Sequence, residues 1–236
     1  TVICSDKTGT LTQNVMTVTR LWVDGRFVEL SGADNDVVGG FRMEGKPVNL
    51  DAYPGVTTAL WVGVLNNDAD LVQAGENGST GYRVVGDPTE ACILMAAARA
   101  GVLQDALNHA YPRQQEIPFD STRKRMVTVH EVQRPRPEDS SPFRDDSLRN
   151  WSAVAVKGAP DMVLRLCTHI QTIDDQVQPL DEQTRQQILL ANDRMTKDAL
   201  RVLGLAYRLS PESPSAIVPA EMEQNLIFAG LVGMID

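Results

Sequence analysis

The sequence predicts an α+β fold with a largely antiparallel sheet flanked by helices. Most of the strand-like segments occur in pairs joined by short turns, and only a few helical segments lie between them. The chain has 236 residues, of which 42% are apolar, which is enough to bury a substantial core. No internal repeat is visible. We therefore expect a globular domain rather than a disordered or repetitive chain.

The first sheet signal is the segment VTRLWVDGRFVEL, which alternates around Asp24-Gly25. This dipeptide favours a two-residue β-hairpin turn. Before it, residues 1–5 predict a short buried strand that ends at Asp6, where glycine and threonines favour a tight loop. Residues 31–50 are glycine-rich and weakly patterned, residues 51–66 have helical spacing, and the segment NNDADLVQAGENGSTG predicts a loop.

The segment GDPTEACILMAAARAG carries the clearest helix signals of the chain. Asp87 is suited to the N-cap, Pro88 to the first helical position, and Gly101 to ending the helix. Glu90 stands three residues after the cap, where a carboxylate can accept a hydrogen bond from the N-cap N–H in a capping box. A helix over about residues 87–101 is predicted.

The second half of the chain predicts further strands and helices in alternation. Residues 133–150 are rich in proline and charge and predict a mobile loop open to proteolysis. Around that loop we expect strands at about 114–118, 126–132 and 151–157, a short helix at 160–167, a hairpin at 169–180, a helix at 181–199, and strands at 201–208 and 226–236.

Both ends of the chain have the apolar pattern of fully buried strands, with a hairpin-rich region between them. This arrangement is typical of a domain inserted into a host domain. We therefore expect a segment excised from a longer protein, with residues 1–14 and 230–236 belonging to the host domain and residues 15–229 forming the inserted domain.

Composition excludes several classes of function. The formal net charge is −9, which opposes binding to nucleic acid or to anionic lipid. Cys4, Cys92 and Cys167 are too few and too widely separated for a disulfide framework or a Cys-x-x-Cys metal site, and a reducing, cytosolic setting fits them best. No apolar run approaches the roughly 18 residues of a membrane-spanning helix. We expect this segment to be soluble and monomeric.

The segment Asp-Lys-Thr-Gly-Thr-Leu-Thr at residues 6–12 has the groups needed for attack on a phosphoryl group. It combines an exposed carboxylate, a cation, hydroxyls and flexible backbone N–H donors. The heptapeptide resembles the phosphorylation motif of the P-type ion-pumping ATPases, within a haloacid-dehalogenase-like α/β domain. By this resemblance Asp6 accepts the γ-phosphate of ATP, Lys7 and Thr8 share the catalytic loop, and Asp6 and Thr8 contribute to an incomplete Mg²⁺ site.

Thr8 stands where soluble phosphatases of the same superfamily carry a second aspartate that transfers protons. Losing such a group commonly costs about 10²–10⁴ in rate, so the acyl phosphate should persist. A persistent acyl phosphate suits a pump better than a phosphatase.

The middle of the chain resembles the nucleotide-binding domain of these pumps. GDPTE resembles the segment near the adenine, which implicates Thr89 and Glu90, and the capping-box role of Glu90 remains equally open. PFDSTRKRM resembles the segment whose phenylalanine, here Phe119, stacks on adenine, with Lys124 near the nucleotide. Calcium pumps of muscle have arginine two positions after this phenylalanine, where this chain has Ser121, so the choice among Arg123, Lys124 and Arg125 stays open.

Two further segments complete the resemblance. VKGAP places the Lys157 cation at a strand end, and Gly158 would allow a ligand to approach the backbone closely. DALRVLGLA resembles the segment whose arginine, here Arg201, contacts the phosphate chain. The resemblance implies a cytoplasmic, ATP-binding segment of a membrane-embedded cation pump, whose remaining Mg²⁺ ligands, actuator domain and transmembrane helices lie outside this sequence. Alone, the segment should bind ATP without turnover.

Three alternatives are weighed against this interpretation. A heavy-metal pump would carry a His-Pro dipeptide, and none of the three histidines precedes proline. A soluble haloacid-dehalogenase-type phosphatase is disfavoured by Thr8 and by the large hairpin domain. A non-catalytic nucleotide-binding module would require the Asp6 motif to be vestigial. No G-x-x-x-x-G-K-[S/T] loop is present, which excludes Walker-type chemistry.

Overall fold

The computed structural model describes residues 16–31, 40–74, 81–132, 151–214 and 219–236. In the first half, these residues form β1 (Thr17–Val23), β2 (Arg26–Ser31), β3 (Gly40–Met43), β4 (Lys46–Val48), the 3₁₀ turn η1 (Leu50–Ala52), α1 (Pro54–Leu65), β5 (Asp70–Ala74), β6 (Gly81–Val85), α2 (Pro88–Arg99) and α3 (Gln104–Ala110). In the second half, they form β7 (Arg113–Asp120), β8 (Arg125–Glu131), β9 (Ser152–Gly158), α4 (Pro160–Leu164), β10 (Cys167–Gln171), β11 (Val177–Pro179), α5 (Glu182–Lys197), β12 (Arg201–Ser210), α6 (Pro219–Met222) and β13 (Leu226–Ile235).

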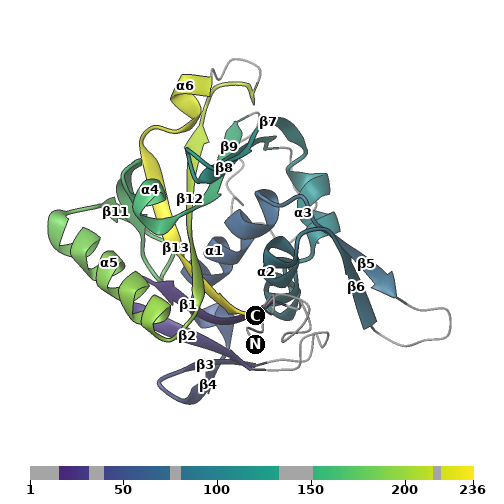
Figure 1. Cartoon of the computed structure of the whole chain (residues 1–236). Coiled ribbons are helices and arrows are strands. Elements are labelled where there is room, and N and C mark those ends of the chain that lie inside the picture. The colour runs from purple at the N-terminus through teal and green to yellow at the C-terminus, as the bar shows by residue number, and fades with distance from the viewer. Residues whose placement is uncertain (1–15, 32–39, 75–80, 133–150, 215–218) are drawn as a thin grey trace, which may run out of the picture.

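One large twisted sheet organises the described residues (Figure 1). Its strand order is β4-β3-β2-β1-β13-β12-β9-β8-β7, with β10 and β11 joined through β13. Its strand pairs are antiparallel except for β10 with β13. The predicted α+β class with a largely antiparallel sheet is therefore confirmed.

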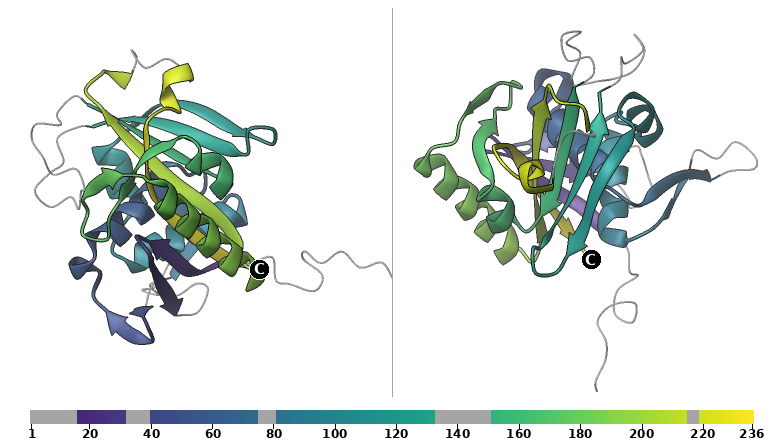
Figure 2. Two further views of the ribbon diagram at one scale, coloured as in Figure 1. Left: turned by 90° about the vertical axis from the view of Figure 1, so that its left-hand side faces the viewer. Right: turned by 90° about the horizontal axis from the view of Figure 1, so that it is seen from above.

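Helices cover both faces of the sheet (Figure 2). On one face, α1, α2 and α3 bury a core that includes Leu60, Ile93 and Leu107 against the strands. On the other face, α4 and α5 pack Val163, Ile188 and Met195 against the opposite side of the same strands. Within the described ranges, none of the helices could span a membrane.

The hairpin predicted at Asp24-Gly25 is confirmed. Both turn residues have positive φ, 46° and 77°, as a type I′ turn requires, and β1 pairs with β2 on either side. The predicted strands at 114–118, 126–132, 151–157 and 201–208, the hairpin at 169–180, and the helices at 51–66, 87–101 and 181–199 also correspond to observed elements.

Two stretches that were predicted as a loop or were weakly patterned contain strands, and α3 was not predicted. The segment predicted as a loop after α1 contains β5, which pairs with β6 in a small separate sheet. The weakly patterned residues 31–50 contain β3 and β4, which extend the large sheet. The predicted strand over 1–5 and the predicted loop over 133–150 lie outside the described residues.

The last strand is a central element of the sheet. β13 runs without a break through the domain boundary predicted at residue 230, and it pairs with β1, β10 and β12. Thr17 pairs with Ile235, so the two ends of the described chain lie side by side.

Candidate functional site

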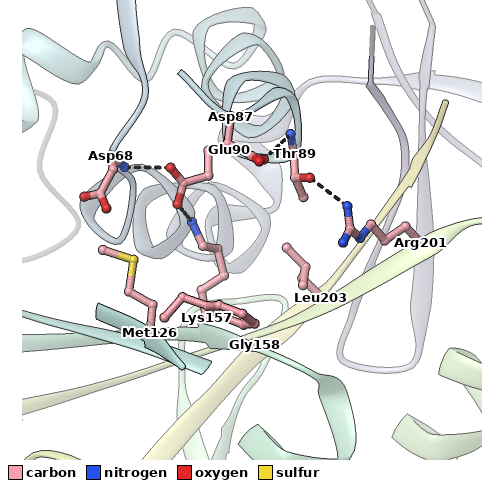
Figure 3. Close-up of a pocket in the computed structure, with 10 residues that line it drawn as sticks. Asp68, Asp87, Thr89, Glu90, Met126, Lys157, Gly158, Arg201 and Leu203 are labelled. Atoms are coloured by element: carbon pink, nitrogen blue, oxygen red, sulfur yellow. Dashed lines mark hydrogen bonds and ion pairs between the residues drawn. The ribbon is translucent and has the colours of Figure 1, made fainter. Parts of the chain in front are cut away.

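A pocket of about 340 Å³ lies between the N-terminus of α2 and the ends of β8, β9 and β12 (Figure 3). Its lining is Asp68, Asp87, Thr89, Glu90, Phe119, Met126, Lys157, Gly158, Arg201 and Leu203. Six predicted nucleotide-binding residues are among them: Thr89, Glu90, Phe119, Lys157, Gly158 and Arg201. Pockets of this size, with apolar walls and a few polar groups, are typical of small-molecule sites.

The start of α2 forms one wall of the pocket, and its geometry follows from the local sequence. Asp87 caps the helix, because its Oδ1 accepts a hydrogen bond of 2.8 Å from the Thr89 N–H. Pro88 occupies the first helical turn. Gly86 has a φ of 135°, and a Cβ there would lie 2.7 Å from Ala69, so only glycine lets the two segments approach.

Glu90 points away from its own helix terminus. Its Oε1 accepts a hydrogen bond of 2.7 Å from Lys157 Nζ, and its Oε2 accepts one of 3.0 Å from the Asp68 N–H. The N-cap N–H of Asp87 is thus not its partner, and the capping-box role is wrong. Figure 3 shows the carboxylate reaching from α2 toward the strands below. Glu90 therefore links three parts of the chain: α2, β9 and the segment that follows α1.

Lys157 lies at the floor of the pocket. Its side chain is only 7% exposed, and Nζ also donates a hydrogen bond of 2.6 Å to the Asn66 carbonyl. Burial lowers the pKa of the Lys157 ammonium, and the adjacent Glu90 carboxylate opposes this shift. The pocket thus contains a buried cation that already has an anionic partner.

The segment after α1 is held in place by Arg113. The Arg113 guanidinium donates to the carbonyls of Leu65 and Asn67 and forms an ion pair of 2.6 Å with Asp68. Asn66 is fully buried, and its side-chain Nδ2 donates a hydrogen bond of 2.8 Å to the Ala155 carbonyl on β9. These contacts fix the Asn66 carbonyl, which accepts from Lys157, and the Asp68 N–H, which donates to Glu90.

Phe119 owes its position to an irregularity in β7. Ile117 pairs with Val127 and Asp120 pairs with Arg125, so Pro118 and Phe119 together oppose the single residue Met126. This is a β-bulge, and Pro118 has no N–H with which to continue the ladder. Phe119 is 64% exposed and lines the pocket. A large apolar ring so open to solvent does not contribute to the core.

The three neighbouring cations have different roles. Arg123 and Arg125 both form ion pairs with Glu223, which lies just before β13. Lys124 is exposed in the turn, with a φ of 54°, and its carbonyl accepts a hydrogen bond from the Ala159 N–H. Lys124 is not among the lining residues, but it is the one of the three whose ammonium has no ion pair among the described residues.

Gly158 is required by the packing of the sheet itself. A Cβ at this position would lie 2.4 Å from the Lys124 carbonyl oxygen and 2.5 Å from the Arg125 Cβ. The sequence suggested that a ligand approaches the backbone at Gly158. In the structure, the β7–β8 turn makes this close approach. Gly158 also contributes to the pocket lining.

Arg201 and two apolar residues complete the wall opposite α2. Arg201 is exposed, and its Nη1 donates a hydrogen bond of 2.9 Å to Thr89 Oγ1, linking β12 to α2 (Figure 3). Leu203 lies two residues farther along β12, on the same face of the strand. Buried Met126 adds an apolar surface from β8.

Sequence reasoning missed several contributors to the site. Met126, Leu203 and Asp87 lie inside the segments that resemble nucleotide-binding segments. Their closeness in the sequence to Phe119, Arg201 and Glu90 was the signal that could have identified them. Asp68 and Asn66 carry no such signal, because their roles depend on backbone groups that meet α2 and β9 only in the folded chain.

The predicted catalytic and Mg²⁺-binding residues Asp6, Lys7 and Thr8 lie outside the described residues. Across the residues that the structure does describe, no group of three or more His, Cys, Asp or Glu side chains is arranged to hold a metal ion.

Residues 55–236 match the family model described as "P-type ATPase, cytoplasmic domain N". Among curated proteins, the whole chain is 37% identical to "Calcium-transporting ATPase 1" of Bacillus cereus and 35% identical to "Cation-transporting ATPase pma1" of Synechocystis, covering 22% and 24% of those proteins. It is 34% identical to the human "Calcium-transporting ATPase type 2C member 1", covering 22% of it. The chain therefore spans less than a quarter of the length of these relatives.

Proposed function

Because the chain belongs to the P-type cation ATPases and contains their cytoplasmic domain N, we propose that its pocket binds ATP. The parent protein is then an ATP-driven cation pump, with this domain on the cytoplasmic side of the membrane. The related proteins named for calcium transport support a cation as cargo. Cation selectivity would reside in membrane helices outside this sequence.

The observation that carries this proposal is the convergence of distant segments on one pocket. Thr89 and Glu90, Phe119, Lys157 and Gly158, and Arg201 come from four separate stretches of the chain and line the same cavity. Each of these stretches was singled out by its resemblance to a nucleotide-binding segment. An unrelated domain would have no reason to place all four together.

The chemistry of the lining fits a purine nucleotide. Phe119 offers an exposed aromatic face for base stacking, and Met126 and Leu203 offer apolar surface beside it. Glu90 can accept a hydrogen bond from an exocyclic amine. The guanidinium of Arg201 is exposed at the pocket wall and suits a phosphate group, while Lys157 adds positive charge from below.

We further propose that Asp6 is the phosphorylated residue of the parent enzyme. Residues 1–14 and the C-terminal end of β13 would connect the described domain to a haloacid-dehalogenase-like phosphorylation domain, where Mg²⁺ would supply charge neutralisation near Asp6 and Thr8. The pairing of Thr17 with Ile235 supports two adjacent connections. Since phosphoryl transfer depends on positioning and on neutralising charge, and most of those groups lie elsewhere, this chain alone should bind ATP without sustained phosphate release.

Calorimetric titration of ATP tests the proposal. Phe119→Ala should weaken binding roughly five- to a hundredfold, because base–aromatic stacking contributes about 1–3 kcal/mol. Lys157→Ala should also weaken binding, and its effect should change little with salt, because the Lys157 charge is buried. Asp6→Asn should bind like the unmodified chain, and binding should depend little on Mg²⁺.

Leu190→Ala is the matched control, because Leu190 is 67% exposed on α5, on the other side of the sheet from α1 and α2. It should leave ATP affinity unchanged. If Asp6→Asn abolished binding while Phe119→Ala had no effect, the nucleotide would sit at the phosphorylation loop and the pocket assignment would be wrong.

A further inference from the structure

The hairpin of β7 and β8 needs an anchor if it is to present Phe119 to a ligand. β7 is an edge strand of the large sheet and, among the described strands, pairs only with β8. Phe119 stands in the bulge of this strand, where the ladder is interrupted, and its ring is largely solvent-exposed. Edge strands with few apolar contacts open more readily than central strands. Contacts beyond the β7–β8 pairing therefore matter for holding the tip of the hairpin.

Glu223 supplies such a contact from a distant part of the chain. One carboxylate oxygen accepts hydrogen bonds from Arg125 Nε, at 3.1 Å, and from Arg123; the other accepts from Arg125 Nη2. Arg125 Nη1 also donates 3.0 Å to the Arg123 carbonyl, which closes the turn on itself. The fork of Arg125 thus meets both carboxylate oxygens, the geometry of a strong charge-assisted pair.

The environment keeps this contact from being an ordinary surface ion pair. The side chains of Arg125 and Glu223 are only 13% and 17% exposed. Partial burial raises the pKa of the Glu223 carboxyl, but the hydrogen bond and charge of Arg125 outweigh this effect, so the net shift is downward. The carboxylate is therefore ionised at neutral pH. Partly buried, bidentate pairs are worth more than exposed ones.

Glu223 acts on the strand directly beside the bulge. Arg125 is the register partner of Asp120, which follows Phe119 immediately. On the same turn, the Lys124 N–H donates to the Asp120 carbonyl, and the Ala159 N–H donates to the Lys124 carbonyl. The segment before β13 thus connects through Arg125 and this turn to the residue that follows Phe119.

We propose that Glu223 is a positioning residue for nucleotide binding, which holds the β7–β8 hairpin so that Phe119 faces the pocket. The expected effect of Glu223 on ATP affinity rests on the proposed function. Its expected effect on the position of the β7–β8 hairpin does not. The hydrogen bonds that Glu223 accepts from described side chains come from Arg123 and Arg125, neither of which lines the pocket. The effect of Glu223 on a ligand must pass through Arg125 and the bulge.

Two measurements on the 236-residue chain test it. In NMR hydrogen exchange without ligand, Glu223→Gln should speed exchange of the Lys124 and Ala159 amides roughly three- to tenfold relative to the amides of α5. In ATP titration, Glu223→Gln should lower the affinity roughly three- to tenfold. Added to Phe119→Ala, it should lower the affinity by at most about a further twofold, because both changes act through the same ring. Arg123→Gln, which removes one partner only, should act in the same direction less strongly.

Glu221→Gln is the matched control, since Glu221 is exposed on α6 two residues away and forms no ion pair among the described residues. Exchange in Glu223→Gln equal to that in Glu221→Gln would overturn the anchoring role. Losses of affinity that multiply fully with Phe119→Ala would overturn the route through Phe119. If the unmodified chain failed to bind ATP, the proposed function would fall, while the exchange measurement would still decide whether Glu223 holds the hairpin.

Discussion

The Lys157 ammonium group is buried, and its neighbours compensate for the lost hydration. Glu90 provides the counter-charge, and the Asn66 carbonyl provides a second acceptor. The two charged residues are 67 positions apart in the sequence, so no local pattern could reveal the pair. The helix-start signal around Asp87 explained Glu90 equally well before the fold was known, and tertiary contact decided between the two roles.

This pair leads to a stability prediction. Glu90→Gln should lower the free energy of unfolding by about 3 kcal/mol, because removing one partner leaves a buried charge uncompensated. Adding Lys157→Met should recover part of that loss, since the double variant has no charge left to bury. Urea unfolding of the two variants measures both effects.

Lys124→Gln is the control for this pair and should change stability little, because Lys124 is exposed in a turn. A double variant no more stable than Glu90→Gln would contradict the argument. It would mean that packing and hydrogen bonding, rather than charge, dominate at the pocket floor.

At the scale of elements, the β8–β9 pairing explains why residue 158 is glycine. The strands approach so closely there that a methyl group would meet backbone atoms, which cannot rotate away. Gly158→Ala should therefore destabilise the chain by about 1–3 kcal/mol, measured by urea unfolding. It should also disturb the turn that carries Lys124.

Gly40→Ala is the matched control for Gly158→Ala, because it also lies in a strand of the sheet. A Cβ there would meet only Ser31 Oγ at 3.7 Å, an ordinary contact. Its effect should be small by comparison. Equal stability losses in the two variants would show that the steric approach at Gly158 does not govern the result.

The elements with strong local signals were predictable, and those without them were not. α2 has a capping aspartate and a proline at its start, and the hairpin of β1 and β2 has an Asp-Gly turn, so both were found from sequence. β5 is short and lies in a segment rich in Asn, Asp and Gly, whose turn propensity concealed it. α3 has seven residues and no side-chain cap, and it therefore gave no start signal.

At the scale of the whole molecule, the strand order brings residues of the candidate site together. The sheet places β12 between β13 and β9, so Arg201 and Lys157 come from adjacent strands although 44 positions separate them. The sequence predicted both strands and both residues by resemblance. Their adjacency depends on long-range pairing, for which a single sequence gives no physical rule beyond the tendency of consecutive strands to pair.

A buried histidine makes the stability of the whole molecule depend on pH. His130 is 1% exposed, with Nδ1 2.9 Å from the Tyr111 carbonyl and Nε2 2.9 Å from Thr128 Oγ1. Burial lowers the pKa of His130 from 6.5 to about 4, despite the opposing hydrogen bond to Tyr111. The folded chain therefore keeps this ring neutral at pH values where the unfolded chain protonates it.

The sign of the effect follows from proton binding. Between the two pKa values the unfolded state binds more protons, so the free energy of unfolding falls as pH drops below about 6.5, and the contribution of His130 levels off below about 4. Urea unfolding at about pH 7.5 and about pH 5 should differ by about 2 kcal/mol from this residue alone. The carboxyl groups with lowered pKa values, Asp120, Asp181 and Glu223, lose their contribution at lower pH and affect this interval little.

His130→Gln should remove most of the difference between those two pH values, because glutamine does not titrate, whatever its effect on stability at neutral pH. His109→Gln should retain the difference, since His109 is exposed on α3. A His130→Gln variant that kept the full pH dependence would show that another group titrates on unfolding. The region where α1, α3 and β8 meet would then not be the acid-sensitive part of the core.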